Sequence, residues 1–289
     1  MSLPAAPRRG FSTYSRLCKV GIALLASGSA LAVAVLASPR MDARLLGPWL
    51  GVFLLACGAG ALNQAQEWQI DARMERTKRR PVPSMSISPG RARALAWSLM
   101  AAGLLVLASV NPIAALLGAF AVVWYNGVYT RLKKISPFAA VPGALTGAIP
   151  PAIGWVGAGR SLADSRVLML CLLLFIWQIP HFWLILLDRA GDYKRAGLPA
   201  LTDFFSDSQI RRILAPWILG TSACSLLLSL SGLVYDSAAR YALLAVSLWL
   251  GYQGIRFRLQ PARESAKLFR CLNIFLVLVL LLLGLGRHI

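Results

Sequence analysis

Long apolar runs alternate with short polar segments along the whole of this 289-residue chain. A helix needs roughly 20 apolar residues to cross the hydrocarbon core of a bilayer, and most of the runs approach that length. Because backbone groups inside a bilayer must satisfy their own hydrogen bonds, such runs predict membrane-spanning helices. Nine spans are predicted, at residues 18–38, 45–66, 93–110, 112–128, 138–158, 165–187, 212–232, 238–255 and 268–286.

The composition agrees with this pattern. The chain is 57% hydrophobic and 14% charged, and its mean hydropathy is +0.64. These values lie outside the range of soluble domains. No internal repeat or soluble segment interrupts the apolar runs. The expected fold is therefore an all-α polytopic membrane protein, with one transmembrane domain spanning residues 1–289.

The basic residues indicate the orientation. If the N-terminus is cytoplasmic, 24 of the 30 Lys and Arg residues fall on the cytoplasmic side and 6 on the other. Such a bias sets the orientation of membrane proteins. Topology and anionic lipid headgroups explain most of the net charge of +19 and argue against a nucleic-acid partner. The expected location is the bacterial inner membrane, with the polar loops of interest facing the cytoplasm.

The most informative segment directly follows the second span. Asn63, Glu67, Asp71 and Glu75 recur every four residues and would share one face of a helix. Acids stacked in this way beside a bilayer repel one another, and a divalent cation would remove that cost. A cluster of basic side chains suited to phosphate groups follows: Arg73, Arg76, Lys78, Arg79 and Arg80. The segment therefore predicts a Mg2+–diphosphate site.

A second acidic loop follows the sixth span. Asp188 and Asp192 repeat the four-residue spacing, and two facing acidic pairs could hold Mg2+ between them. Alternatively, these acids only neutralise nearby arginines or cap helices. In the loop after the fourth span, Tyr129 and Lys133 also share a helical face. The Lys133 ammonium could neutralise a departing diphosphate, or it could anchor the topology.

The sixth span ends in the aromatic segment Trp177–Trp183, which contains Pro180 and His181. His181 is the one histidine inside a predicted span, and an ionisable residue in a membrane is a functional candidate. It could bind an acceptor, or it could close the hydrogen-bonding gap left by Pro180. Trp177 and Trp183 could shield a cationic intermediate through their ring faces, or belong to an interfacial belt.

Three blocks of the chain resemble the UbiA-type intramembrane prenyltransferases, most closely their heme branch. The blocks are Asn63–Pro81, with Asp-x-x-Met-Glu-Arg-Thr-x-x-Arg-Pro; Tyr125–Trp155, with Tyr-Thr-x-Leu-Lys-Lys and Gly-Ala-Ile-Pro-Pro-x-Ile-Gly-Trp; and Trp177–Pro199, with Trp-Gln-x-Pro-His-Phe-Trp and Asp-Tyr-x-x-Ala-Gly-x-Pro. Three departures are present. Glu67 stands where the family has Asp, and Gly191 precedes Asp192 where the heme branch has a second acid. Phe138-Ala-Ala replaces the polar residue that usually follows the Tyr-Thr-x-Leu-Lys element.

The resemblance implies nine helices around a central cavity and Mg2+-dependent transfer of a farnesyl group from farnesyl diphosphate to a vinyl group of heme B. It places Asn63, Glu67 and Asp71 in the first metal motif and Asp188 and Asp192 in the second. Tyr129 and Lys133 match its Tyr-x-x-x-Lys element. The basic residues expected to bind diphosphate are Arg76, Lys78, Arg80, Lys133 and Lys194, and the catalytic candidates are Asp71, Asp192, Lys133 and Tyr129.

The acceptor-binding candidates are His181, Trp177 and Trp183. Expected partners are farnesyl diphosphate, heme B and the lipid bilayer, with heme A synthase or terminal-oxidase assembly proteins as further candidates. Two alternatives stay open from the residues alone. One is a UbiA-type enzyme that prenylates an aromatic quinone precursor, and the other is a non-catalytic scaffold or carrier with the same fold.

Overall fold

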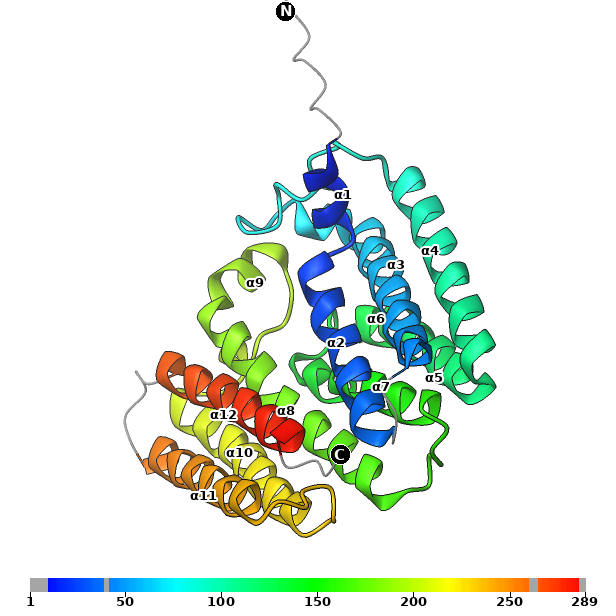
Figure 1. Cartoon of the computed structure of the whole chain (residues 1–289). Helices are drawn as coiled ribbons and strands as arrows, with labels where there is room; N and C mark the ends of the chain where they lie inside the picture. The colour runs from blue at the N-terminus through cyan, green and yellow to red at the C-terminus, as the bar shows by residue number, and fades with distance from the viewer. Residues whose placement is uncertain (1–9, 39–41, 260–264, 286–289) are drawn as a thin grey trace, which may run out of the picture.

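A computed structural model describes residues 10–38, 42–259 and 265–285. These residues form helices and connecting turns, and no strand occurs among them (Figure 1). The helices, in chain order, are α1 Phe11–Leu17, α2 Val20–Ala37, α3 Leu46–Asp71, α4 Pro89–Val110, α5 Pro112–Val122, α6 Thr130–Leu132, α7 Ala140–Gly157, α8 Ser165–Asp188, α9 Ala190–Ala196, α10 Asp207–Ser229, α11 Ser237–Leu259 and α12 Ser265–Leu285.

The all-α membrane fold expected from the sequence is confirmed. Among the described residues, eight helical segments are long and apolar enough to cross a membrane. The predicted span at 238–255 is present as α11, which has 23 residues but is not among those eight. Polar positions such as Arg240 and Gln253 reduce its apolar character. The fourth span continues from α5 through a π-helical segment, Val123–Tyr129, into α6.

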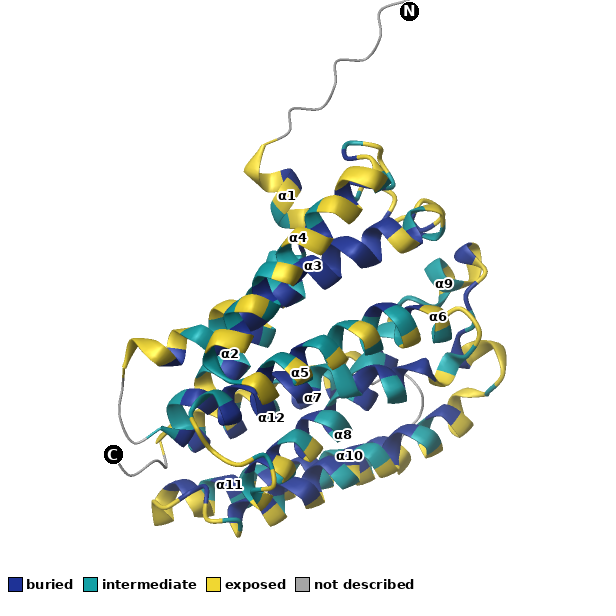
Figure 2. Ribbon diagram, turned by 90° about the vertical axis from the view of Figure 1, so that its right-hand side faces the viewer, coloured by how far each residue is buried: buried dark blue, intermediate teal, exposed yellow. Residues whose placement is uncertain are grey.

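The helices pack as two groups joined by α7. In one group α3 packs along α4 and beside α2, and in the other α8, α10, α11 and α12 pack together (Figure 1). α7 contacts both α2 and α8, so it connects the two groups. Figure 2 shows α3 buried over much of its length between its neighbours. This burial matters because α3 carries the first acidic motif.

Small residues allow the closest helix contacts, as is common inside membranes. A Cβ atom built on Gly154 of α7 would lie 2.0 Å from the carbonyl oxygen of Ala30 on α2. A real Cβ contact cannot be that short, so the backbones of α2 and α7 approach closely only because residue 154 is glycine. At Gly28 on α2, by contrast, a Cβ atom would have nothing within 4 Å.

Gly154→Ala should therefore separate α2 from α7 and lower the free energy of unfolding by about 1–3 kcal/mol. Thermal unfolding of the purified protein in detergent measures this. Gly28→Ala is the matched control and should leave the midpoint unchanged or raise it slightly, because alanine is the better helix former. Equal midpoints for the two variants would contradict the close α2–α7 contact.

Candidate active site

The last two turns of α3 present the first acidic motif on one buried face. Asn63, Glu67 and Asp71 are 2%, 5% and 3% exposed. The helix ends at Asp71, where the Thr77 hydroxyl donates a hydrogen bond of 2.7 Å to the Asp71 carbonyl oxygen. The prediction that Glu75 shares this face is wrong, because Glu75 lies beyond the end of the helix and is exposed.

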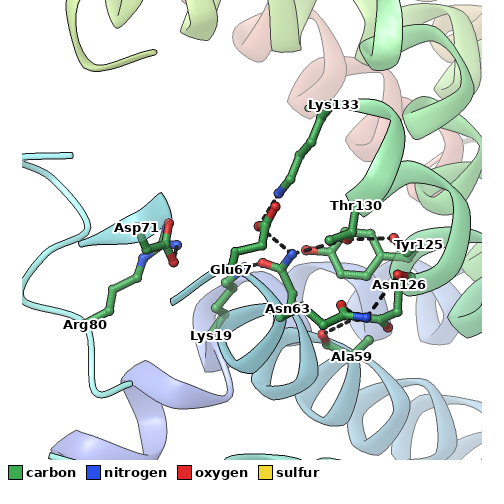
Figure 3. Close-up of polar contacts among 11 residues, drawn as sticks. Lys19, Ala59, Asn63, Glu67, Asp71, Arg80, Tyr125, Asn126, Thr130 and Lys133 are labelled. Atoms are coloured by element: carbon green, nitrogen blue, oxygen red, sulfur yellow. Dashed lines mark hydrogen bonds and ion pairs between the residues drawn. The ribbon is translucent and has the colours of Figure 1, made fainter. Parts of the chain in front are cut away.

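Glu67 and Asn63 lie in a polar network that includes side chains from distant segments (Figure 3). Oε2 of Glu67 forms an ion pair with Lys133 and accepts a 2.8 Å hydrogen bond from Nδ2 of Asn63. That Nδ2 atom also lies 3.3 Å from the hydroxyl of Thr130, and Nζ of Lys19 donates to Oδ1 of Asn63 at 2.7 Å. Burial lowers the pKa of Lys19 to about 8, with repulsion from Arg80 adding to the shift. The network joins three segments far apart in the sequence.

Asp71 has a cationic partner of its own. Nη1 of Arg80 lies 2.8 Å from Oδ2 of Asp71, after the chain has reversed direction through residues 72–80 (Figure 3). A buried carboxylate is stable only when a cation or several hydrogen-bond donors compensate its charge. Arg80 and Lys133 are two of the residues predicted to bind diphosphate, and both lie in contact with a predicted metal ligand.

The π-helical segment before α6 positions Tyr129. Its ring stacks on Tyr125, with centroids 5.8 Å apart, and Nζ of Lys133 lies 5.6 Å from its centroid. Gly143 of α7 leaves room for this ring, since a Cβ there would lie 2.5 Å from Tyr129. Single π-helical turns in helices often occur at functional sites. The predicted pairing of Tyr129 with Lys133 is thus seen in space.

The second acidic motif lies across a break between two helices. α8 ends at Asp188 and α9 begins at Ala190, with a break at Arg189, so Asp188 and Asp192 do not share a continuous helical face. Oδ1 of Asp192 accepts hydrogen bonds from Nη2 of Arg195 at 2.5 Å and from the Glu75 amide at 3.3 Å. The Arg195 guanidinium holds the pKa of Asp192 below its usual range.

The two acidic loops meet at a cavity of about 530 Å3. Residues of the first loop line one side and residues of the second loop line the other: Glu75, Arg76, Asp188, Arg189, Gly191, Asp192 and Arg195. Arg76 therefore lies between the two loops. Lys78 instead pairs with exposed Glu75 at 2.6 Å, and Lys194 is exposed on α9.

The predicted metal ligands supply only oxygen donors, which suit a hard cation such as Mg2+. The structure brings Asn63, Glu67 and Asp71 together on α3 and places Asp188 and Asp192 on the facing loop. Within the described ranges, no three His, Cys, Asp or Glu side chains are close enough to form a metal cluster. Glu67, Asp71 and Asp192 instead pair with Lys133, Arg80 and Arg195. The oxygen donors therefore suit Mg2+, and in this structure basic side chains neutralise these carboxylates.

His181 lies deeper along α8, between two aromatic rings. Its ring stacks on Trp177 at 4.6 Å and lies 4.9 Å from Phe269 of α12. Its Nδ1 atom is buried and has no hydrogen-bond partner among the described residues. The indole of Trp177 donates to the carbonyl of Leu272, and that of Trp183 donates to the carbonyl of Pro137. Both tryptophans are therefore fixed by packing and hydrogen bonds.

Sequence reasoning missed several residues of this network. Lys19, which lies between α1 and α2 and has a left-handed backbone conformation (φ 51°, ψ 46°), donates a hydrogen bond to Asn63. The Thr130 hydroxyl donates a hydrogen bond of 2.8 Å to the Tyr125 carbonyl. Nδ2 of Asn126 donates one of 3.1 Å to the carbonyl of Ala59 on α3. Asn126 lies inside an apolar predicted span, and a buried amide there is the signal that could have identified it.

Comparison with known proteins places this site in a family. Residues 22–279 match the UbiA prenyltransferase family. A protoheme IX farnesyltransferase of Geobacter sulfurreducens is 40% identical over 254 residues, which cover 88% of this chain and 92% of that protein. A protoheme IX farnesyltransferase of Bordetella avium is 34% identical over 287 residues and covers 96% of this chain and 95% of its own.

Solved structures share the fold. A digeranylgeranylglyceryl phosphate synthase superposes with a TM-score of 0.82 at 19% identity, covering 96% of this chain and 98% of its own. A UbiA homologue of Archaeoglobus fulgidus, bound to GPP and Mg2+, superposes with a TM-score of 0.69 at 17% identity, over 95% of this chain and 98% of its own. On the family match and the extent of these relatives, the chain belongs to the UbiA prenyltransferase family.

Proposed function

We propose that this protein is a Mg2+-dependent protoheme IX farnesyltransferase. It transfers a farnesyl group from farnesyl diphosphate to a vinyl group of heme B and so makes heme O. The observation that carries the proposal is the buried oxygen face of α3, compensated by cations, in a chain whose relatives are named for this reaction. The domain extends over residues 1–289 and lies in the bacterial inner membrane, with the site at the cytoplasmic rim.

The proposed division of roles follows the geometry. Asn63, Glu67 and Asp71 from α3, with Asp188 and Asp192 from the facing loop, would hold Mg2+, which when bound offsets the charge of the diphosphate. The basic side chains at the rim would bind the diphosphate oxygens: Arg76, Lys78, Arg80, Lys133 and Lys194. Lys133 and Tyr129 are proposed to stabilise the diphosphate as it departs, because they lie together beside Glu67.

The chemistry begins as the allylic C–O bond of farnesyl diphosphate breaks and its electron pair leaves with the diphosphate. The heme vinyl group then supplies the electrons for the new C–C bond. Water adds to the resulting cation and loses a proton to solvent, which gives a hydroxyethylfarnesyl group. The aromatic residues Trp177, His181 and Trp183 are proposed to hold the acceptor, and a cavity closed to water protects the cation. Heme A synthase or terminal-oxidase assembly proteins are proposed as partners.

Pigment analysis of membranes expressing the protein tests this function. The expected result is conversion of heme B to a later-eluting farnesylated heme. Turnover of farnesyl diphosphate with an aromatic acid and not with heme would favour the quinone-precursor reaction. No turnover with either acceptor would favour a non-catalytic scaffold.

Asp71→Asn and Asp192→Asn should each reduce Mg2+-dependent farnesyl transfer by about a hundredfold or more, because each removes a proposed metal ligand at the reacting diphosphate. Product formation in membranes with matched protein levels measures the loss. Asp42→Asn is the control: Asp42 caps the turn before α3 at the other end of that helix, and asparagine can keep the cap. Near-normal turnover in either site variant would assign that acid to charge balance alone.

His181→Ala should reduce heme farnesylation by about tenfold while leaving Mg2+-dependent binding of farnesyl diphosphate unchanged. The reason is position: His181 precedes Asp188 by two helical turns, roughly 10 Å deeper in the bilayer than the carboxylates. Heme transfer and diphosphate binding are measured on the same preparation. If heme farnesylation and diphosphate binding fall together, or if neither changes, His181 has a structural role beside Pro180 and does not bind the acceptor.

A further inference from the structure

A second cavity lies outside the network around Glu67 and Asp71. It has a volume of about 620 Å3, which is in the range of small-molecule sites. It lies between the C-terminal ends of α8 and α11 and the N-terminal ends of α10 and α12. Figure 1 shows these four ends on the same side of this group of helices. Its apolar lining includes Leu184, Ile210, Phe257 and Phe269. Asp188 and Arg189 line this cavity and the one between the acidic loops, so the two spaces adjoin.

Arg189, Arg211 and Arg270 line the cavity together with Asp188 and Asp207, so positive charges exceed negative ones by one. In the part of the chain that the structure describes, none of the three arginines forms an ion pair. Nη1 of Arg211 is buried and has no hydrogen-bond partner there. A buried N–H donor without a partner is costly, and the planar donors of a guanidinium match the oxygens of a carboxylate or phosphate. The cavity therefore suits an anionic group attached to an apolar body.

The apolar side of the cavity leads to His181. Phe269 lines the cavity, and its ring lies 4.9 Å from that of His181, which in turn stacks on Trp177. On α8, His181 precedes Leu184 and Asp188 by three and seven residues, so all three lie near one face of the helix. Phe269 thus connects the cavity that holds the arginines to His181, which lies behind this ring and whose Nδ1 atom lacks a partner among the described residues.

From this arrangement we infer that the cavity binds the carboxylates of the porphyrin acceptor, with Arg211 as the main partner and Arg270 and Arg189 beside it. The inference rests on the proposed function and adds the subsite that selects the acceptor. A porphyrin with two propionates combines a flat apolar body with two anionic groups on one edge. That shape matches the apolar lining of the cavity with guanidiniums beside it.

Titration of the Soret band of the purified full-length protein in detergent tests this subsite. Heme B is compared with heme B dimethyl ester, whose propionates are blocked. The unmodified protein should bind heme B about tenfold or more tightly than the ester, which is the size expected for losing one charge-assisted hydrogen-bond pair. Arg211→Gln should weaken heme B binding by the same factor and leave ester binding unchanged. Arg212→Gln, an exposed neighbour that does not line the cavity, is the matched control.

Three results would overturn the inference. They are equal affinity of the unmodified protein for heme B and its ester, unchanged heme B affinity in Arg211→Gln, and loss of bound phosphatidylglycerol in that variant without loss of heme binding. The last would make the cavity a lipid-headgroup site. Farnesyl diphosphate binding to Arg211→Gln should stay normal, which shows that the variant is folded. If the unmodified protein makes no farnesylated heme, the proposed function fails, while the titration still decides the cavity.

Discussion

The carboxylates of Glu67 and Asp71 are buried at the end of a membrane helix, and this arrangement depends on cations that reach them from other segments. Without compensation, each carboxylate would cost several kcal/mol in such a position. Lys133 comes from the segment after α6, and Arg80 comes from the chain reversal after α3. Compensation of these two charges therefore fixes how the loops fold over α3.

The same arrangement of paired charges also equips the site to bind a metal and a diphosphate. The carboxylates contact Arg80 and Lys133, so acidic and basic groups lie side by side. The carboxylates can bind the metal ion, and the basic groups can bind the phosphates. Asp192 and Arg195 repeat this combination on the facing loop. Binding would then replace internal ion pairs with pairs to the substrate and its metal. The net charge buried in the site would change little.

The sequence predicted the helical fold because apolar runs of spanning length have few alternatives in a membrane. It predicted that Asn63, Glu67 and Asp71 share a face, because residues spaced by four lie on one side of a helix as long as the helix continues. Glu75 was misplaced because the helix ends at Asp71, and the loop folding that ends it is not visible in residue spacing. Lys19 and the cavity at Arg211 depend on contacts between segments far apart in the chain, which no local pattern records.

The proposed function requires the buried carboxylates to exchange their internal cations for a metal and a diphosphate. Binding of farnesyl diphosphate to the purified protein, with and without Mg2+, tests it most directly when the unmodified protein is compared with Glu67→Gln. We expect Mg2+ to tighten binding to the unmodified protein by about tenfold or more, and Glu67→Gln, which lacks a charged ligand, to lose most of this dependence. Equal Mg2+ dependence in both proteins would show that Glu67 serves only as the partner of Lys133.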